Sequence, residues 1–424
     1  MPFALYLLGL AVFAMGTSEF MLSGLVPDIA SDMNVSVPAA GALTSAFAAG
    51  MIVGAPLMAV LSLRWPRRRA LLAFLVSFLL LHVLGAVTTG FEVLLVTRFA
   101  GAVANAGFLA VAVATAAALA PSAAKGRATS ILLGGVTLAC VAGVPAGALL
   151  GQLWGWRSAF WAVALLSAPA VIAVLRSIPA APGRTQVAPA RTEAVPARTE
   201  ADQARTETGV AGAGGGAGRE ARALRDPRPL VLLLLAALVN GATFCTFTYL
   251  APLATTVSGI APAWMPGLLA LFGLGSFAGV TVSGRLADSR PRLLLTAGGA
   301  ALVVGWAVFA AAADRPAAVP VLVFTLGALS FAVGSTLVSQ VLYAAPGAPT
   351  LAGSFATAAF NVGAAAGPWL GGVTIGAGLG YRSPLWVSAA LVALALAFAT
   401  TAHALERVRT RPVTAPRTGV VGEK

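Results

Sequence analysis

Apolar residues run in long stretches along this chain, and short polar segments or segments with proline and glycine interrupt them. About 20 consecutive apolar residues are enough for a helix to cross a hydrocarbon layer of about 30 Å. By that criterion the sequence predicts twelve spans in two sets of six. The first set covers residues 4–26, 39–62, 70–89, 92–118, 128–151 and 156–176, and the second covers 229–251, 264–284, 293–313, 316–342, 351–375 and 383–403.

An internal repeat relates the two sets. Gly16 and Pro27 of span 1 correspond to Gly241 and Pro252 of span 7 at an offset of 225 residues. The same offset aligns LSLRWPRRRALL, after span 2, with LADSRPRLLLTA, after span 8. Two halves in parallel orientation are typical of transporters that bind substrate between the halves, near the membrane midplane.

We therefore predict an all-α integral membrane protein whose twelve transmembrane helices form two pseudo-symmetric six-helix bundles. The predicted bundles cover 1–176 and 229–403, with a linker at 177–228 and a cytoplasmic tail at 404–424. The linker repeats ARTE at 190, 197 and 204, but no apolar pair accompanies this seven-residue spacing. A coiled coil needs such pairs, so we expect a flexible linker.

Composition agrees with a membrane protein, because 58% of the residues are hydrophobic and 10% are charged. Soluble domains contain about 25% charged residues. The net charge of +13 comes from basic residues in the loops beside the spans, so it indicates topology and not a nucleic-acid partner. Cys140 and Cys245 lie in apolar spans without metal-like spacing, and we expect neither a metal nor another cofactor.

Basic residues cluster after spans 2, 4, 6, 8 and 12. By the positive-inside rule these segments, both termini and the linker face the cytoplasm. The apolar start of the chain lacks a preceding basic residue and a clear cleavage site, so we expect an uncleaved first span. The predicted location is the plasma (inner) membrane.

Two charges stand out because they lie well inside apolar spans: Glu19 among the 14 acidic residues and Arg98 among the 27 basic ones. Glu19 is about 13 Å and Arg98 about 9 Å from the outer helix ends, which permits a direct or water-bridged contact if spans 1 and 4 are neighbours. A charge inside the membrane is costly and by default indicates an ion or substrate pathway. Glu19 is thus a candidate proton carrier, or a carboxyl satisfied by Ser23 or a backbone carbonyl. Arg98 is its candidate partner, or a side chain that extends outward to the interface.

The second half lacks such charges, since the repeat places Phe244 opposite Glu19 and Val323 opposite Arg98. It offers polar and aromatic side chains that would suit an organic molecule. Packing through interhelical hydrogen bonds remains open for Asn240, Tyr249 and Asn361. The substrate-binding candidates are Ser23, Asn105, Asn240, Phe244, Phe247, Tyr249, Gln340 and Asn361.

Glycines recur at every fourth residue in spans 5 and 11, a spacing that lets helices approach closely. Pro145 and Pro368 remove backbone donors in these spans and favour a bend. We expect a tightly packed, bent helix near the interface of the halves. The glycines are Gly143, Gly147 and Gly151 in span 5 and Gly363, Gly367 and Gly371 in span 11.

Two other features admit structural interpretations. The cluster of Arg67, Arg68 and Arg69 could be an inside-positive anchor, or a latch that stabilises one access state. His82 has no evident partner in span 3, so packing is the simpler interpretation. The candidate cytoplasmic gating residues are Arg64, Arg67, Arg68, Gly284, Asp288 and Arg292.

The plan of six spans, a basic linker and six spans resembles the major facilitator superfamily. Residues 59–68, AVLSLRWPRR, are similar to the family's Gly-x-Leu-Ala-Asp-Arg-x-Gly-Arg-Arg loop, although Leu63 and Pro66 stand at its aspartate and second glycine. GRLAD, at 284–288, keeps the acidic position. RFAGAVANAG, with Arg98, is similar to the family's span 4 motif, which is associated with proton coupling.

GGVTLACVAGVPAGALLGQ in span 5 looks like the antiporter motif of the drug:proton exporters, with Gly135, Gly143, Pro145 and Gly147 in place. GTSEFMLSGLVPDIA in span 1 and AFNVGAAAGPWLGG in span 11 are similar to bacterial chloramphenicol-resistance and arabinose-efflux-like exporters. The resemblance implies proton-coupled efflux of a small amphipathic antibiotic, with chloramphenicol or a related phenicol as the favoured substrate. It implies alternating access and a monomer whose partners are the drug, protons and the lipid bilayer.

Two other classes of function stay open. A sugar or metabolite exporter could use the same scaffold. A membrane receptor or enzyme is the other, but the sequence lacks a catalytic constellation, so we do not expect an enzyme.

Overall fold

The computed structural model describes residues 3–62, 65–119, 125–177, 227–287, 289–344 and 349–409. Every regular element in these ranges is a helix, and twelve helices are long and apolar enough to span a membrane. The predicted all-α, twelve-span fold is therefore confirmed. Nearly all of the predicted linker at 177–228 and most of the predicted tail lie outside the described residues.

The first six spans are built from eight α-helices, because spans 1 and 5 are each divided. The helices are α1 (Phe3–Phe20), α2 (Val26–Asp32), α3 (Val37–Ser62), α4 (Arg67–Val87), α5 (Phe91–Leu119), α6 (Lys125–Leu138), α7 (Val144–Trp154) and α8 (Arg157–Ser177).

The second six spans are built from seven α-helices, with span 7 divided. They are α10 (Pro227–Thr248), α11 (Leu250–Pro252), α12 (Met265–Leu286), α13 (Pro291–Ala312), α14 (Ala318–Ala344), α15 (Pro349–Thr374) and α16 (Ser383–Arg409). Helix α10 begins just before the predicted border at 229 and α16 runs past the one at 403. The domain borders themselves remain predictions.

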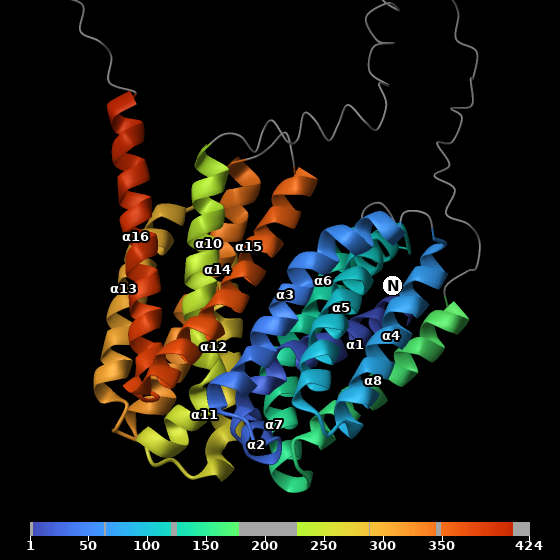
Figure 1. Cartoon of the computed structure of the whole chain (residues 1–424). Coiled ribbons are helices and arrows are strands. Elements are labelled where there is room, and N and C mark those ends of the chain that lie inside the picture. Colours follow the sequence, from blue (N-terminus) through green and yellow to red (C-terminus); the bar gives the residue numbers. More distant parts are fainter. Residues whose placement is uncertain are drawn as a thin grey trace, which may run out of the picture.

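The same helix pairs pack together in both bundles. In the first bundle α1 packs on α6, α3 on α5, and α4 on α8; in the second, α10 packs on α15, α12 on α14, and α13 on α16. Between the bundles, α3 contacts α15 and α7 contacts α12. Figure 1 shows the bundles converging near α2, α7 and α11 and diverging toward the ends at which α10 and α15 begin.

Spans 1 and 7 break at equivalent positions for the same reason. Proline has no backbone N–H to donate to the carbonyl four residues earlier. Pro27 therefore leaves the Ser23 carbonyl without this donor, and Pro252 does the same for Thr248. In span 1 a 3₁₀ turn, Met21–Gly24, separates α1 from α2, and in span 7 Tyr249 separates α10 from α11. At both breaks a backbone N–H donates to the carbonyl three residues earlier: Leu25 N–H to Leu22 O and Tyr249 N–H to Thr246 O.

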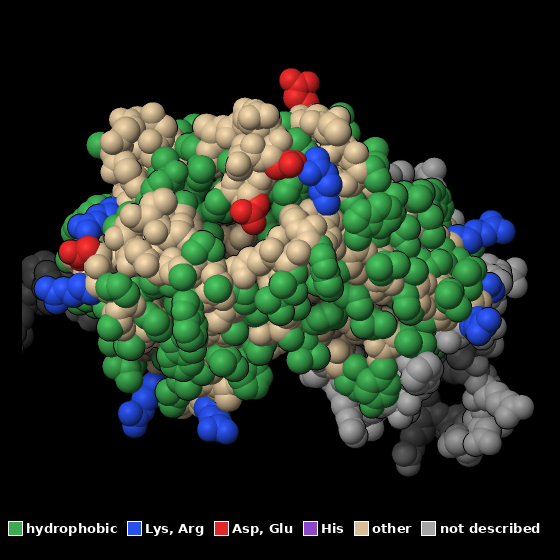
Figure 2. Space-filling view, turned by 90° about the horizontal axis from the view of Figure 1, so that it is seen from below, with side chains coloured by type: hydrophobic (Ala, Val, Ile, Leu, Met, Phe, Trp, Pro, Cys, Tyr) green, Lys and Arg blue, Asp and Glu red, His purple; other side chains and the backbone are tan. Residues whose placement is uncertain are grey.

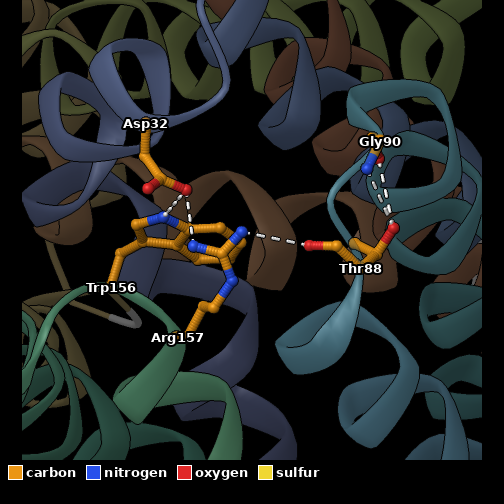
Figure 3. Close-up of polar contacts among 5 residues, drawn as sticks. All are labelled: Asp32, Thr88, Gly90, Trp156 and Arg157. Carbon is orange, nitrogen blue, oxygen red and sulfur yellow. Dashed lines mark hydrogen bonds and ion pairs between the residues drawn. The ribbon is translucent and has the colours of Figure 1, made fainter.

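An ion pair and hydrogen bonds join three segments at the end of the first bundle where the bundles converge (Figure 3). Arg157 at the start of α8 donates to the Asp32 carboxylate of α2 at 2.5 Å and to Thr88 O at 3.1 Å. Trp156 donates its indole N–H to the same carboxylate at 3.1 Å. We call Asp32, Trp156, Arg157 and Thr88 the outer clamp, after the side of the membrane that the positive-inside rule predicts for this end.

The face at this end combines charged side chains of both signs with a largely hydrophobic surround (Figure 2). Trp154 and Trp161, near the clamp, are exposed as expected for an aromatic belt at the interface, whereas Trp156 is buried. Trp156 differs because its indole N–H has the Asp32 carboxylate as a partner.

Candidate functional site

Glu19 lies at the break of span 1, one residue before α1 ends. Its side chain is half-buried and makes no hydrogen bond to a described residue. The Ser23 hydroxyl, a possible partner in the sequence, instead donates to Phe20 O at 3.0 Å. The carboxyl group is therefore held at the discontinuity without a local acceptor or donor.

Arg98 is buried in the first bundle and does not extend outward. Its Nη1 donates to Ser18 Oγ at 2.8 Å and its Nη2 donates to Ser18 O at 2.9 Å. The guanidinium carbon lies 4.4 Å from the centre of the Phe47 ring, a cation–π contact. Arg98 thus bonds to Ser18, the residue next to Glu19. Its Nε is buried without a partner in the described part of the chain.

Glu19 and Arg98 do not form the direct contact that helix depth permitted: within the described ranges no ion pair joins them. Their charges are near enough to interact electrostatically, and Arg98 bonds to Ser18, the residue that precedes Glu19. Ser18 thus holds the buried positive charge of Arg98 close to Glu19, and the Glu19 carboxylate forms no ion pair with a described residue.

His82 belongs to the same network. Its Nε2 lies 2.6 Å from Ser18 Oγ and its Nδ1 lies 2.8 Å from Phe78 O. Arg98 can only donate and Phe78 O can only accept. For a neutral imidazole the directions are therefore fixed: Arg98 donates to Ser18, the Ser18 hydroxyl donates to Nε2, and Nδ1–H donates to Phe78 O.

Sequence reasoning missed both Ser18 and His82. A lone histidine in an apolar span was the available signal, but its partner is 64 residues away, on another helix. We call Ser18, His82, Arg98 and the adjacent Glu19 the charge site.

Aromatic rings lead from the charge site into the second bundle. Phe20, next to Glu19, stacks on Phe244 of α10 with ring centres 5.7 Å apart. Phe244 meets Phe247 edge to face at 6.4 Å, and Phe247 stacks on Phe272 of α12 at 4.3 Å. The row ends with Phe331 of α14, 6.1 Å from Phe272. Two of the five, Phe244 and Phe247, were sequence candidates.

A pocket of about 200 Å³ lies at the end of this aromatic row. Asn240, a sequence candidate, lines it and donates its amide to Phe360 O at 2.7 Å. Ser330 also lines it, and its hydroxyl is buried without a partner in the described part of the chain. Small-molecule pockets usually measure about 300–1,000 Å³, so this one would hold only part of a drug-sized molecule. The lining residues are Asn240, Thr243, Ser330, Phe331, Gly334, Ser335, Val338 and Phe360.

Four other sequence candidates lie outside this pocket. Tyr249 is buried and donates its hydroxyl to Pro368 O at 2.8 Å, so it joins α10 to α15. Asn361 donates to Thr357 O on its own helix at 2.9 Å. Asn105 is buried in α5, and Gln340 lines a different cavity in the second bundle.

Span 5, which carries the antiporter motif, packs between α1 and the second bundle. A side chain at Gly135 would meet the backbone of Gly9, and one at Gly143 would meet Thr17 Oγ1. On the other side, Gly273 of α12 packs on the backbone of Cys140.

Pro145, at the start of α7, follows a π-helical turn, Ala139–Gly143, which interrupts the span where it touches both partners. Gly147 lies farther along the same face of span 5, where an added Cβ would contact the Met21 side chain. Span 5 therefore connects α1, which carries Ser18 and Glu19, with the second bundle.

Span 11 shows the equivalent packing. Side chains at Gly363 and Gly367 would meet the backbone of α10, and one at Gly371 would meet Cys245. Both cysteines are buried and unpaired, as expected for packing residues.

The gating candidates are only partly described. Arg64 and Asp288 lie outside the described residues. Arg67 and Arg68 begin α4, Gly284 lies near the end of α12, and Arg292 lies near the start of α13. No ion pair joins Arg67, Arg68 or Arg292 to another described residue. The latch remains a prediction. Within the same ranges, no group of three or more His, Cys, Asp or Glu side chains could hold a metal ion.

Comparisons with known proteins agree with this architecture. A chloramphenicol resistance protein of Streptomyces lividans is 55% identical over 396 residues, which cover 93% of this chain and 95% of the relative. The inner membrane transport protein YdhP of Escherichia coli (strain K12) is 33% identical over 401 residues, covering 93% and 94%.

Solved structures share the fold at low identity. A bacterial homologue of the human lysosomal transporter Spinster, inward-facing and unoccupied, has a TM-score of 0.69 and 18% identity, covering 93% of this chain and 94% of that one. The nucleoside transporter NupG has a TM-score of 0.66 and 13% identity, covering 94% and 98%. The sequence model described as Major Facilitator Superfamily matches residues 8–353. With most of its length matched, the chain belongs to the Major Facilitator Superfamily.

Proposed function

We propose that this protein is a proton-driven exporter of a small amphipathic antibiotic, with chloramphenicol or a related phenicol as its substrate. The observation that carries the proposal is the continuous row of aromatic rings in contact, stacked or edge to face, from Phe20 beside Glu19 to the pocket at Ser330. The 55% identical relative named for chloramphenicol resistance supports the substrate class.

Glu19 is the proton carrier in this proposal. It lies at a helix break, where the backbone can rearrange, and its side chain is half-buried and without a hydrogen-bonding partner among the described residues. It takes a proton from the outer side and releases it to the cytoplasm. Arg98, fixed through Ser18, supplies the positive charge that faces the carboxylate once the proton has left.

The drug binds across the two bundles. Its aromatic ring stacks in the row that begins at Phe20 and Phe244, where a ring contact contributes about 1 kcal/mol beyond area burial. A polar end enters the pocket, where the unpaired Ser330 hydroxyl is available to it. Stacking and a few hydrogen bonds suit an uncharged amphipathic molecule.

Alternating access couples the two events. Because the bundles converge at the outer clamp and diverge at the opposite end, this conformation suits drug entry from the cytoplasm (Figure 1). We place both termini in the cytoplasm and the protein in the plasma membrane as a monomer that needs no cofactor. Span 5 packs on both α1 and α12. It transmits movement between the two bundles and seals the cavity between them.

The test is a resistance panel in a pump-deficient, drug-sensitive host, with and without an uncoupler. Chloramphenicol resistance should appear on expression and disappear when the proton gradient collapses. Unchanged drug sensitivity together with uptake or release of a sugar in a transport panel would favour the metabolite exporter. Resistance that persists with the uncoupler would contradict proton coupling.

Ser330→Ala separates substrate binding from stability. Its hydroxyl has no partner in the described part of the chain, so its removal should leave folding unchanged and weaken drug binding. A lost hydrogen bond of about 1 kcal/mol raises KM about fivefold. Ser276→Ala is the matched control, because that buried hydroxyl bonds only to Phe272 O on its own helix. Equal KM values in wild type and Ser330→Ala would remove this pocket from the proposal.

A further inference from the structure

His82 is a buried side chain of α4 to which the proposed transport cycle gives no role. Its imidazole packs on the rings of Phe78 and Phe160, with ring centres 4.1 and 5.8 Å away. Both ring nitrogens have partners, Phe78 O for Nδ1 and Ser18 Oγ for Nε2. Burial of a polar ring costs free energy that its hydrogen bonds must offset, so packing alone favours an apolar residue at this position.

Ser18 connects His82 with the buried charge of Arg98. The Ser18 hydroxyl lies 2.6 Å from His82 Nε2 and accepts from Arg98 Nη1 at 2.8 Å, and Ser18 O accepts from Nη2 at 2.9 Å. In a helix a serine or threonine hydroxyl commonly donates to a carbonyl of its own helix, as Thr17 does to Phe13 O. The acceptor on His82 instead draws the Ser18 proton toward α4. The lone pairs of the hydroxyl oxygen then remain available to Arg98.

The second bundle packs the equivalent helices without this network. Helix α4 packs on α5 and α13 on α14, so both halves share these contacts. Yet the repeat offset of 225 residues places neither an imidazole nor a charge at the related positions. Of these, Thr243 has a hydroxyl, which donates to Val239 O on its own helix at 3.0 Å. The fold therefore does not depend on the network, which lies in the half that carries Glu19. The related residues are Thr243, Ala307 and Val323, for Ser18, His82 and Arg98.

We propose that His82 is a positioning residue, which orients the Ser18 hydroxyl and thereby holds the Arg98 guanidinium close to Glu19. Both hydrogen bonds of Arg98 to described residues end on Ser18, so the orientation of this hydroxyl decides how firmly the charge is held. His82 acts through Ser18 and forms no hydrogen bond with Glu19. The inference rests on the proposed role of Glu19 as the proton carrier, and it names the residue that fixes the counter-charge of that carrier.

Two amide variants separate positioning from proton transfer. In His82→Gln the amide oxygen reaches the place of Nε2 and accepts from Ser18, whereas the shorter side chain of His82→Asn reaches only the place of Nδ1. Neither amide carries a proton at neutral pH. A positioning role is therefore restored in His82→Gln and lost in His82→Asn, and a proton-carrying role is lost in both. His82→Leu, apolar and of similar size, repeats the loss if His82→Asn does not fold.

The first measurement does not depend on drug. Infrared difference spectroscopy of the full-length protein follows the band of the protonated Glu19 carboxyl against pH, and Glu19→Gln assigns the band. The midpoint should move by about one pH unit in His82→Asn, which is about 1.4 kcal/mol of interaction with the counter-charge, and should match wild type in His82→Gln. Besides Arg98 and His82, the Cys140 thiol lies near Glu19, and these variants leave it unchanged.

The second measurement is drug-dependent proton flux in proteoliposomes. Flux should fall about tenfold in His82→Asn, which corresponds to about 1.4 kcal/mol, the order expected for a lost hydrogen bond to a charged group. Wild-type flux should return in His82→Gln. Phe160→Leu is the control, because it removes ring packing on His82 and keeps both hydrogen bonds. It should lower Tm without moving the infrared midpoint.

Two results would overturn the inference. Wild-type midpoint and flux in His82→Asn and His82→Leu would show that Ser18 holds Arg98 without His82. A loss in His82→Gln as large as that in His82→Asn would show proton transfer through the imidazole. Absence of drug-dependent flux in wild type would instead refute the proposed function, and the infrared midpoints would still decide the role of His82.

Discussion

Ser18 holds the buried charge of the first bundle in place. A guanidinium inside a bundle is tolerated only with hydrogen-bonding partners, and Arg98 has two, both on Ser18. The hydroxyl joins both neighbours, because it accepts from Arg98 and donates to His82. At the scale of single residues, the position of the charge behind Glu19 therefore depends on one serine side chain.

Replacing Ser18 with Ala should weaken both the fold and transport. The change leaves an Arg98 N–H and His82 Nε2 without their partner, and each unsatisfied buried group costs about 1–3 kcal/mol. Tm of the purified protein and drug resistance of expressing cells measure the two effects. We expect a clear fall in Tm and loss of most resistance.

Ser167→Ala provides the control for this prediction. Ser167 is equally buried, but its hydroxyl bonds only to Val163 O on its own helix. Its replacement should change Tm little. If the Ser18 and Ser167 variants behaved alike, the network would have no special role.

These residue contacts show where sequence reasoning ends. An acid and an arginine inside apolar spans are rare enough to be recognised individually, and both lie in the charge site. Serine is common in spans because its hydroxyl can bond to its own helix, as Ser23 and Ser167 do. Nothing in the sequence distinguishes Ser18 from these, and His82 became interpretable only once the fold placed it beside Ser18.

Among the elements, span 5 is the most tightly constrained. Gly143 faces α1, where an added Cβ would lie against Thr17 Oγ1, whereas Gly134 faces open space. The same helix therefore offers a constrained and an unconstrained glycine. The contact explains the requirement for glycine by close approach of two helices, without any unusual backbone conformation.

Gly143→Ala should separate span 5 from α1 and impair transport. Thr17 is β-branched, so it has few rotamers into which its hydroxyl could move. Overpacking of this kind typically costs about 1–3 kcal/mol. Drug resistance and Tm of the variant should both fall below those of Gly134→Ala, which should match wild type. Equal values for the two variants would show that α1 can yield at this position.

The breaks in spans 1 and 7 were not predicted, although the sequence carries a signal for them. Pro27 and Pro252 are related by the repeat, and each deprives a carbonyl of its donor four residues earlier. The π-helical turn of span 5 was less accessible, because a proline predicts a bend but not which neighbouring helices the bend will fit. That fit depends on Thr17 of α1 and Gly273 of α12, far away in the sequence.

The outer clamp should depend on pH in the acid range. Hydrogen bonds from Arg157 and Trp156 hold the pKa of the Asp32 carboxyl below its ordinary value of about 3.9. The clamp therefore contributes stability above about pH 4 and loses it as pH falls through the lowered pKa. Because the Asp32 side chain is 45% exposed, we expect a contribution below about 1 kcal/mol.

Comparison of Asp32→Asn with wild type tests the clamp. Tm of the variant should be lower at pH 7, and the difference should shrink below about pH 4. Asp314→Asn is the control, because the Asp314 to Arg382 pair is longer, at 3.7 Å, and more exposed, so its Tm should change less. A Tm difference for Asp32→Asn that did not vary with pH would contradict the assigned titration.

For the whole molecule, the internal repeat predicted the symmetric bundles, but the site that joins them is asymmetric. The repeat placed Phe244 opposite Glu19, and the structure stacks Phe244 on the neighbouring Phe20. Continuation of the row through Phe272 and Phe331 depends on how α10, α12 and α14 pack, which hydrophobic patterns do not specify. Sequence thus predicted the halves and the acid, and the structure supplied the connection between them.

The central claim is that Glu19 exchanges a proton for drug. The direct measurement is drug-dependent proton flux in proteoliposomes that contain wild type, Glu19→Gln or Glu92→Gln. Glu92 is an exposed carboxylate at the start of α5, so its variant controls for the loss of a negative charge. The account predicts that flux is abolished in Glu19→Gln and retained in Glu92→Gln. Full drug-dependent flux in Glu19→Gln would contradict it.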